Sequence, residues 1–296
     1  MAKAPARAEA HGVPVVVTVH GPMHREIASA RGLPLDDSTI RWIRELEGRA
    51  FLEADAVISV DLAHAEYVRG FGRPDPIHVI PNFVDTRRYH PAVPSTPFPD
   101  RIEALVAQRH VLFCPRRLVP KNGVSVAIRA MRLLEDLGSH YALVVAGDGQ
   151  ERRQLEILVA DLNLQRAVHF LGSVPAPSMP GLYRRSDVIV VPSVPSLGVE
   201  EATSISALEG QACARPVIAS NLGGLREIIQ EGETGLLLPP GDAAAIAEAV
   251  ERVTADPYLA SHLAAAGARH VQDRHSHVAG ARRYAEIYRG LGVGPA

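Results

Sequence analysis

Cysteine is scarce in this chain, and long apolar runs are missing. The two cysteines, Cys114 and Cys213, lie far apart and outside any Cys-x-x-Cys pattern. The sequence therefore predicts neither a disulfide framework nor a cysteine-based metal site, and it indicates a reducing compartment. No stretch approaches the roughly 18 consecutive apolar residues of a membrane span, and the first residues, MAKAPARAEAHG, lack the apolar centre of a signal peptide. We therefore expect a cytoplasmic protein.

A strong charge of either sign is also lacking. The 296 residues include 31 Lys and Arg against 33 Asp and Glu, which gives a net charge of −2. The basic residues are scattered along the chain, so we expect no nucleic-acid partner, and an acidic ligand would need a local site. With 47% hydrophobic and 22% charged residues, the composition is that of a globular chain with one large domain or two moderate ones.

Short apolar runs rich in β-branched residues alternate with helical patterns in the first part of the chain. The runs at 13–19, 56–60 and 77–81 are typical of buried parallel strands, and helices are expected at 45–53 and 61–71. A proline-rich stretch at 90–100, HPAVPSTPFPD, disfavours regular structure and marks a boundary. We predict an N-terminal domain at 1–91, a linker at 92–106, a second domain at 107–272 and a C-terminal helix at 273–296 that packs back on the first domain.

The second domain has a clearer alternation of strands and helices, which predicts a doubly wound α/β fold. The expected strands are 110–114, 141–146, 168–171, 188–191 and 216–219, and the expected helices are 124–137, 151–162, 179–185, 204–212 and 225–230, followed by two alanine-rich helices.

Two carboxylates with seven residues between them, Glu201 and Glu209 in EATSISALE, follow the strand at 188–191. A strand that runs through a loop into a helix brings both near a helix N-terminus, whose free N–H groups and partial positive charge suit a phosphate. The carboxylates themselves accept hydrogen bonds from hydroxyls. This pattern suits a nucleotide sugar, although the spacing alone favours two charges on a solvated helix face.

Two cations flank the turn after the strand at 110–114. Arg117 follows the strand, and Lys121-Asn122-Gly123 opens the next helix. Arg gives forked hydrogen bonds and Lys a mobile point charge, so together they suit a diphosphate without a metal, and the alternative is a solvated basic turn. Gly147-Asp148-Gly149 repeats the arrangement one unit later, where the glycines would also serve a tight turn and Asp148 a helix cap.

Histidines offer a weaker signal. His20 ends the first strand, where open α/β sheets bind ligands, although a structural role is the commoner one. His275 and His277 lack partners with zinc spacing, and we interpret them as surface residues. No Asp-x-Asp occurs, so no carboxylate pair is expected to hold a metal on a donor diphosphate.

Taken in order, these segments resemble the retaining glycosyltransferases of the GT-B class that carry the Glu-seven-Glu pattern, often called family 4. The resemblance rests on PVVVTVHG, ADAVISV, VIPNFVDTRRYHP, RRLVPKNG, LVVAGDGQERRQLE, VHFLGSV, SDVIVVPS, EATSISALEGQACARPVIASNLGGLREII and ETGLLLPPGD. It implies two Rossmann-like domains, the first of them incomplete.

The resemblance also implies the roles of individual residues. Arg117 and Lys121 would hold the donor diphosphate, Glu209 would accept hydrogen bonds from the ribose, and Glu201 would contact the transferred sugar. His20 would lie near that sugar from the opposite domain, and the backbone near Val174 would touch the base. We expect these further residues to belong to the donor site: Gly147, Thr203, Ser204 and Ile205.

The implied reaction moves a hexose-type sugar from a nucleotide diphosphate sugar to an acceptor hydroxyl with retention, without a metal or other cofactor. The acceptor, a glycan, a lipid-linked group or a small molecule, is unknown, and peripheral contact with the inner membrane face and oligomer formation are expected possibilities. A nucleotide-binding module without catalysis is the alternative, and an epimerase or a phosphorylase on the same scaffold is a third interpretation.

Three features depart from the family pattern. Asn122 stands where the family has the lysine before the glycine, and Ala202-Thr203-Ser204 replaces a glycine-containing loop. The first βα units of the family have no counterpart before His11, so we expect either a truncated chain or a reduced N-terminal domain, with an exposed sheet edge.

Overall fold

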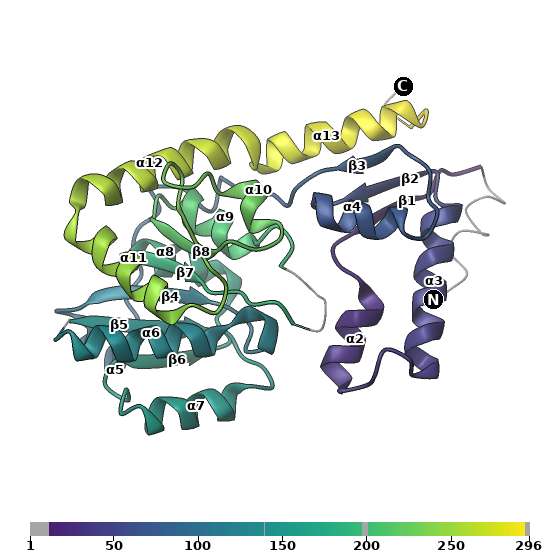
Figure 1. Ribbon diagram of the computed structural model, residues 1–296. Helices are drawn as coiled ribbons and strands as arrows, with labels where there is room; N and C mark the ends of the chain where they lie inside the picture. The colour runs from purple at the N-terminus through teal and green to yellow at the C-terminus, as the bar shows by residue number, and fades with distance from the viewer. Residues whose placement is uncertain (1–11, 139, 197–200, 294–296) are drawn as a thin grey trace.

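The computed structural model describes residues 12–138, 140–196 and 201–293, which form two α/β units (Figure 1). In the N-terminal unit, three parallel strands pair in the order β1-β2-β3. These strands are β1 (Val16–Val19), β2 (Ala56–Ser59) and β3 (Ile77–Val79), joined through α2 (Met23–Arg31), α3 (Ser38–Glu53) and α4 (Leu62–Arg69).

The C-terminal unit holds a six-stranded sheet in the order β6-β5-β4-β7-β8-β9, and each neighbouring pair is parallel. The order runs one way from β4 to β6 and the other way from β7 to β9, so a topological switch point lies between β4 and β7. In open α/β sheets, ligands bind outside the carboxyl ends of the strands at such a point. The strands are β4 (His110–Pro115), β5 (Tyr141–Ala146), β6 (Val168–Gly172), β7 (Val188–Val191), β8 (Val217–Ser220) and β9 (Leu236–Leu238).

Both faces of this larger sheet are buried, as continuous apolar strands predict. Alternate residues of β4 point to opposite sides: Leu112 and Cys114 pack in one core, and Val111 and Phe113 pack in the other. The remaining helical segments are α5 (Asp100–Val106), η1 (Pro120–Asn122), α6 (Val124–Asp136), α7 (Arg152–Asp161), η2 (Ala176–Ser178), α8 (Met179–Arg185), α9 (Ile205–Ala212), α10 (Leu225–Ile228), α11 (Ala243–Ala255), α12 (Pro257–Arg274) and α13 (His277–Gly290).

The proline-rich segment before β4 contributes to the C-terminal core. Phe98 is 2% exposed, and Ile102 and Val106 of α5 pack with it against the sheet. The second half of the segment that the sequence assigns to a linker is therefore helical and buried against the second unit.

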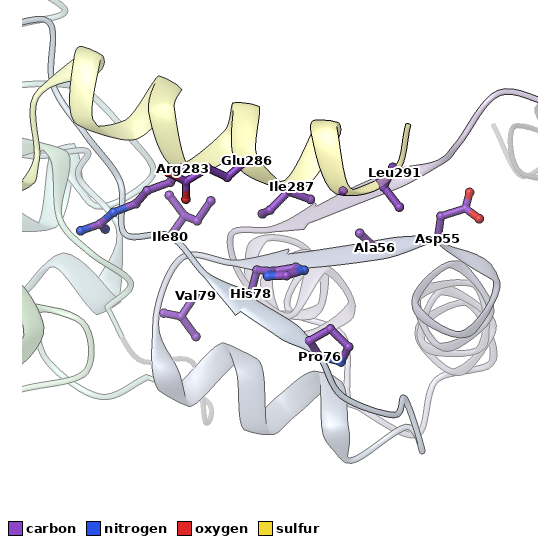
Figure 2. A pocket seen from close by; sticks show the side chains of 11 residues that line it. Asp55, Ala56, Pro76, His78, Val79, Ile80, Arg283, Glu286, Ile287 and Leu291 are labelled. Carbon is purple, nitrogen blue, oxygen red and sulfur yellow. The ribbon is translucent and has the colours of Figure 1, made fainter. Parts of the chain in front are cut away.

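The last two helices cross from the C-terminal unit to the N-terminal one (Figure 1). Ile287 of α13 packs with Ala56, Ile58 and Ile80 on one face of the small sheet. Figure 2 shows α13 lying over β2 and β3. A cavity of about 520 Å³ lies between them, and its lining includes His78 of β3 and Arg283 of α13. The small sheet therefore obtains part of its cover from the far end of the chain.

Three local features differ from the expectations. Helix α2 was not expected, and α3 begins at Ser38 rather than near 45 because Asp37 caps it, accepting a hydrogen bond from Thr39 N at 2.8 Å. The interpretation of His275 as a surface residue was wrong, since it lies at the junction of α12 and α13 and is 4% exposed. Burial lowers the pKa of His275 to about 4.

Candidate functional site

A cavity of about 280 Å³ lies between the two units, beside the switch point of the larger sheet. One wall is α2 of the N-terminal unit, which contributes Glu26, Ile27, Ser29 and Ala30. The opposite wall is the turn between β4 and α6, together with Gln150 and Ser196 from neighbouring loops. The cavity therefore occupies the position at which a doubly wound sheet binds its ligand.

Arg117 and Lys121, the two cations predicted from the sequence, both line this cavity. Lys121 Nζ forms an ion pair with Glu26 Oε1 of α2 at 2.8 Å. Arg117 is exposed, and no hydrogen bond or ion pair joins its guanidinium to any residue in the described ranges. One cation is thus free and the other is held only by a half-exposed carboxylate, an arrangement that suits an anionic ligand.

The turn that carries Lys121 is fixed by a close approach of two backbones. Gly123 adopts φ +61°, and a Cβ atom at this position would lie 2.0 Å from the carbonyl oxygen of Pro192. Only glycine fits, because a side chain would collide with rigid backbone at the end of β7. Val194 N also donates to Lys121 O at 2.9 Å, so the loops after β4 and β7 form one surface.

Glu201 lies at the base of this surface in a buried ion pair with Arg116, a residue that the sequence analysis did not single out. Arg116 Nη1 donates to Glu201 Oε1 at 3.1 Å, and Nη2 donates to Oε2 at 2.6 Å. Burial by itself raises the pKa of Glu201, but Arg116 and Lys121 outweigh it and hold the pKa below its ordinary value. Glu201 is therefore an ionised acceptor of hydrogen bonds.

Glu209, the second member of the pair, projects from α9 and is only partly exposed. Its Oε2 accepts a hydrogen bond from Tyr183 OH at 2.7 Å. Burial raises the pKa of Glu209, and the hydrogen bonds from Tyr183 and Tyr89 counteract this in part. The free lone pairs of the carboxylate remain available to hydroxyl donors.

Thr203 joins the Glu201 loop to the N-terminal unit. Its hydroxyl accepts a hydrogen bond from Asn82 N at 2.9 Å and donates to Val60 O at 3.3 Å. Asn82 Nδ2 donates to Thr203 O at 2.7 Å. The hydroxyl predicted to bind the donor is thus used for a contact between the units.

The other predicted donor residues surround the same loops. Ser204 Oγ accepts a hydrogen bond from Arg116 Nη1 at 3.1 Å, and Ile205 begins α9 with 51% of its surface exposed. Gly147 has φ +143°, and a Cβ there would lie 2.1 Å from Arg116 O, so its first role is to admit the neighbouring loop. Val174 is partly buried against the second core.

His20 is exposed at the end of β1, on the N-terminal side of the cavity. The structure does not bring its ring into a hydrogen bond with any residue in the described ranges. The next residue, Gly21, lies close to two side chains: a Cβ atom there would lie 3.1 Å from Glu26 Oε1 and 3.9 Å from His64 Nε2. The His64 ring is held by Asp61 through Nδ1 at 2.6 Å. The strand end therefore lies next to Glu26 of α2, which lines the cavity.

The described residues lack both a metal-binding cluster and a membrane span. No group of three or more His, Cys, Asp or Glu side chains among them is placed to hold a metal ion. No helix within the same residues is long and apolar enough to cross a bilayer.

Comparison with known proteins identifies the family. The family model described as Glycosyl transferases group 1 matches residues 98–270, and the model described as Glycosyltransferase Family 4 matches residues 1–88. The chain belongs to the group 1 glycosyl transferases. Its architecture is that of the GT-B glycosyltransferases: HepE of Anabaena, solved in complex with UDP, aligns with a TM-score of 0.78 at 22% identity, over 98% of this chain and 76% of HepE.

Two curated relatives indicate the range of the family. A GDP-mannose-dependent alpha-(1-6)-phosphatidylinositol monomannoside mannosyltransferase of Mycolicibacterium smegmatis is 30% identical over 82% of this chain and 64% of its own length. A D-inositol 3-phosphate glycosyltransferase of Acidothermus cellulolyticus is 31% identical over 89% of this chain and 59% of its own length. The chain thus spans about three fifths of the length of these curated relatives.

Proposed function

We propose that this protein transfers a glycosyl group from a nucleotide diphosphate sugar to an acceptor hydroxyl, with retention and without a metal ion. One observation carries this function: the free Arg117 and the weakly held Lys121 line one cavity at the switch point of the sheet. Membership of the group 1 glycosyl transferases supports it. So do the printed names of relatives, which include a GDP-mannose-dependent enzyme and a structure with bound UDP.

The two cations would bind the diphosphate and stabilise the negative charge that develops on it as the sugar leaves. Arg117 offers a planar pair of donors and Lys121 a mobile point charge, which together serve without a metal. Preorganised groups of this kind are worth about 3 kcal/mol each where removal has been measured in other enzymes. Glu26 would release Lys121 when the diphosphate arrives.

The two carboxylates would read the hydroxyl groups of the donor. Glu209 would accept hydrogen bonds from the ribose and Glu201 from the transferred sugar. The acceptor would enter from the side of α2, so that its hydroxyl attacks the face that the diphosphate leaves, and the phosphate would take its proton. Exclusion of water between the two units would limit hydrolysis of the donor. We expect this reaction in the cytoplasm, with peripheral membrane contact if the acceptor is lipid-linked.

The test is release of nucleoside diphosphate from UDP-glucose and from GDP-mannose, measured with and without a panel of glycan, polyol and lipid-linked acceptors. We expect release that depends on an acceptor and that falls at least tenfold in Glu209→Ala, because the ribose loses a charged acceptor worth that much. Glu248→Ala, which changes an exposed glutamate of α11, is the matched control and should leave release unchanged. Binding of a nucleotide sugar without release under any condition would instead indicate a binding module.

A further inference from the structure

Arg116 directly precedes Arg117 of the cavity wall and is almost entirely hidden from solvent. It follows the last residue of β4 and is 7% exposed. Its guanidinium donates to four side chains at once: Asn122 Oδ1 at 2.5 Å, Ser193 Oγ at 3.0 Å, Ser204 Oγ at 3.1 Å and both oxygens of Glu201 at 3.1 and 2.6 Å. A buried charge of this kind is tolerated when it is paired and hydrogen-bonded. Both terminal nitrogens of the guanidinium are bonded in this way, while Nε has no hydrogen-bond partner within the described ranges.

The bonds to Glu201 leave one acceptor position open. Oε2 accepts from Arg116 Nη2 and from Ser193 Oγ at 3.2 Å, which uses both of its lone pairs. Oε1 accepts only from Arg116 Nη1 among the bonds of the described residues. The Glu201 side chain keeps 11% of its surface exposed, and Oε1 is its oxygen with a lone pair to spare.

We propose that Arg116 is a positioning residue of the donor site: it fixes Glu201 so that Oε1 accepts one hydrogen bond from a hydroxyl of the transferred sugar. Arg116 does not touch the donor itself. This assignment rests on the proposed function and adds to it the residue that orients and neutralises the carboxylate. It separates the three neighbouring cations into two tasks, with Arg116 serving the sugar side and Arg117 and Lys121 serving the diphosphate.

The charge balance of the cavity supports this division. A lone carboxylate beside the diphosphate position would repel the donor, and burial would drive it to take up a proton. The charged groups that face Glu201 are Arg116 from β4 and Lys121 from η1, and both lower its pKa against the effect of burial. Since Arg116 neutralises Glu201, the charges of Arg117 and Lys121 remain available for phosphate.

The experiment compares the wild type with Arg116→Gln, Arg116→Lys, Glu201→Gln and the double variant Arg116→Gln/Glu201→Gln. Affinities are measured for UDP and UDP-glucose and for GDP and GDP-mannose, and the pair that binds is used. In Arg116→Gln we expect the diphosphate affinity to stay within about twofold, while the preference for the nucleotide sugar over the diphosphate falls about tenfold, the value of a charged hydrogen bond. The double variant should lose no more than Glu201→Gln alone.

The pH dependence of transfer provides a readout that a merely structural role would not move. In the wild type the carboxylate stays ionised because Arg116 and Lys121 hold its pKa low. In Arg116→Gln the acid limb of activity should move to higher pH, since burial then raises the pKa of Glu201 with only Lys121 opposing it. Arg116→Lys keeps the charge but loses the forked geometry, so it should keep the acid limb and still lose part of the sugar preference.

Arg185→Gln is the control. It breaks the partly buried ion pair of Arg185 with Glu103 in the same unit, and neither residue lines the cavity. It should change neither the sugar preference nor the pH profile. If Arg116→Gln fails to fold, Arg116→Lys decides alone. Wild-type sugar preference and pH profile in the folded Arg116 variants would overturn this assignment while leaving the proposed function intact. A wild-type protein that binds neither UDP nor GDP would remove the proposed function and this assignment with it.

Discussion

The two sheets of this protein use the same βα connections but differ in how they are stabilised. Every residue of β5 in the six-stranded sheet is buried, whereas three of the four residues of β1 in the three-stranded sheet are half-buried. The large sheet lies between two extensive cores, and the small sheet has two clusters with seven and four buried members. The small sheet therefore depends on contacts from outside its own unit.

Those outside contacts come from the C-terminal unit at several points. Helix α13 supplies Ile287, the Glu201 loop supplies Thr203, and Glu227 of α10 accepts a hydrogen bond from Leu62 N at 2.9 Å. These contacts join the two units that line the cavity, so the geometry of the cavity and the stability of the small sheet are linked.

The largest expected effects come from one core substitution in each sheet. Leu143→Ala in β5 should cost about 2–5 kcal/mol of unfolding free energy, because the rigid core around it leaves a cavity. Ile58→Ala in β2 should cost about 2 kcal/mol, the low end of this range, since its cluster is small. The measurement is urea unfolding followed by far-UV circular dichroism and by fluorescence of Trp42, the single tryptophan, which lies on α3 of the N-terminal unit.

The two probes separate the units. In Ile58→Ala the Trp42 transition should precede the dichroism transition, because the small unit opens first. In Leu143→Ala both transitions should move together, since the small unit loses its support when the large one unfolds. A Trp42 transition that is unchanged in Leu143→Ala would show that the N-terminal unit is independent, against this account.

The next effect is acid destabilisation through His275, which lies where the chain crosses between the units. Its pKa falls from 6.5 to about 4 on folding, so its contribution to stability is present above pH 6.5 and is lost as pH falls through about 4. The shift corresponds to roughly 3 kcal/mol. We expect His275→Asn to flatten the decline of the melting temperature between pH 6.5 and 4 relative to the wild type, while His262→Asn, which changes a histidine with 39% of its side-chain surface exposed, should not.

The smallest effect is expected from the ion pair that crosses the cavity. Glu26→Gln removes the competitor for Lys121, so the affinity for UDP or GDP should rise about twofold to fivefold at low salt and the gain should fade at high salt. Glu66→Gln, which breaks an exposed pair with Arg69 in the same unit, is the control. Weaker binding of the nucleotide by Glu26→Gln would indicate that Glu26 contacts the nucleotide itself and does not compete with it for Lys121.

Much of this arrangement could be predicted from the sequence, because the strands of the large sheet are continuous apolar runs and the cations follow one of them directly. Arg116 could not be separated from Arg117, since only the fold decides which neighbour turns inward. His275 was misjudged for the same reason: it is buried where the end of α12 meets a segment distant in sequence, to which it is joined by the hydrogen bond from Val84 N to His275 O at 2.9 Å. Two departures from the family pattern now have a physical explanation, because both Asn122 and Ser204 accept hydrogen bonds from Arg116.

Binding of the diphosphate between Arg117 and Lys121 is tested most directly by calorimetric titration of UDP and GDP into the wild type, Arg117→Ala and Arg129→Ala. Arg129 is an exposed arginine of α6 that does not line the cavity, so its variant controls for loss of a positive charge. We predict that one nucleotide binds the wild type and Arg129→Ala equally and that Arg117→Ala binds it at least tenfold more weakly. Equal affinities in all three proteins would contradict the account.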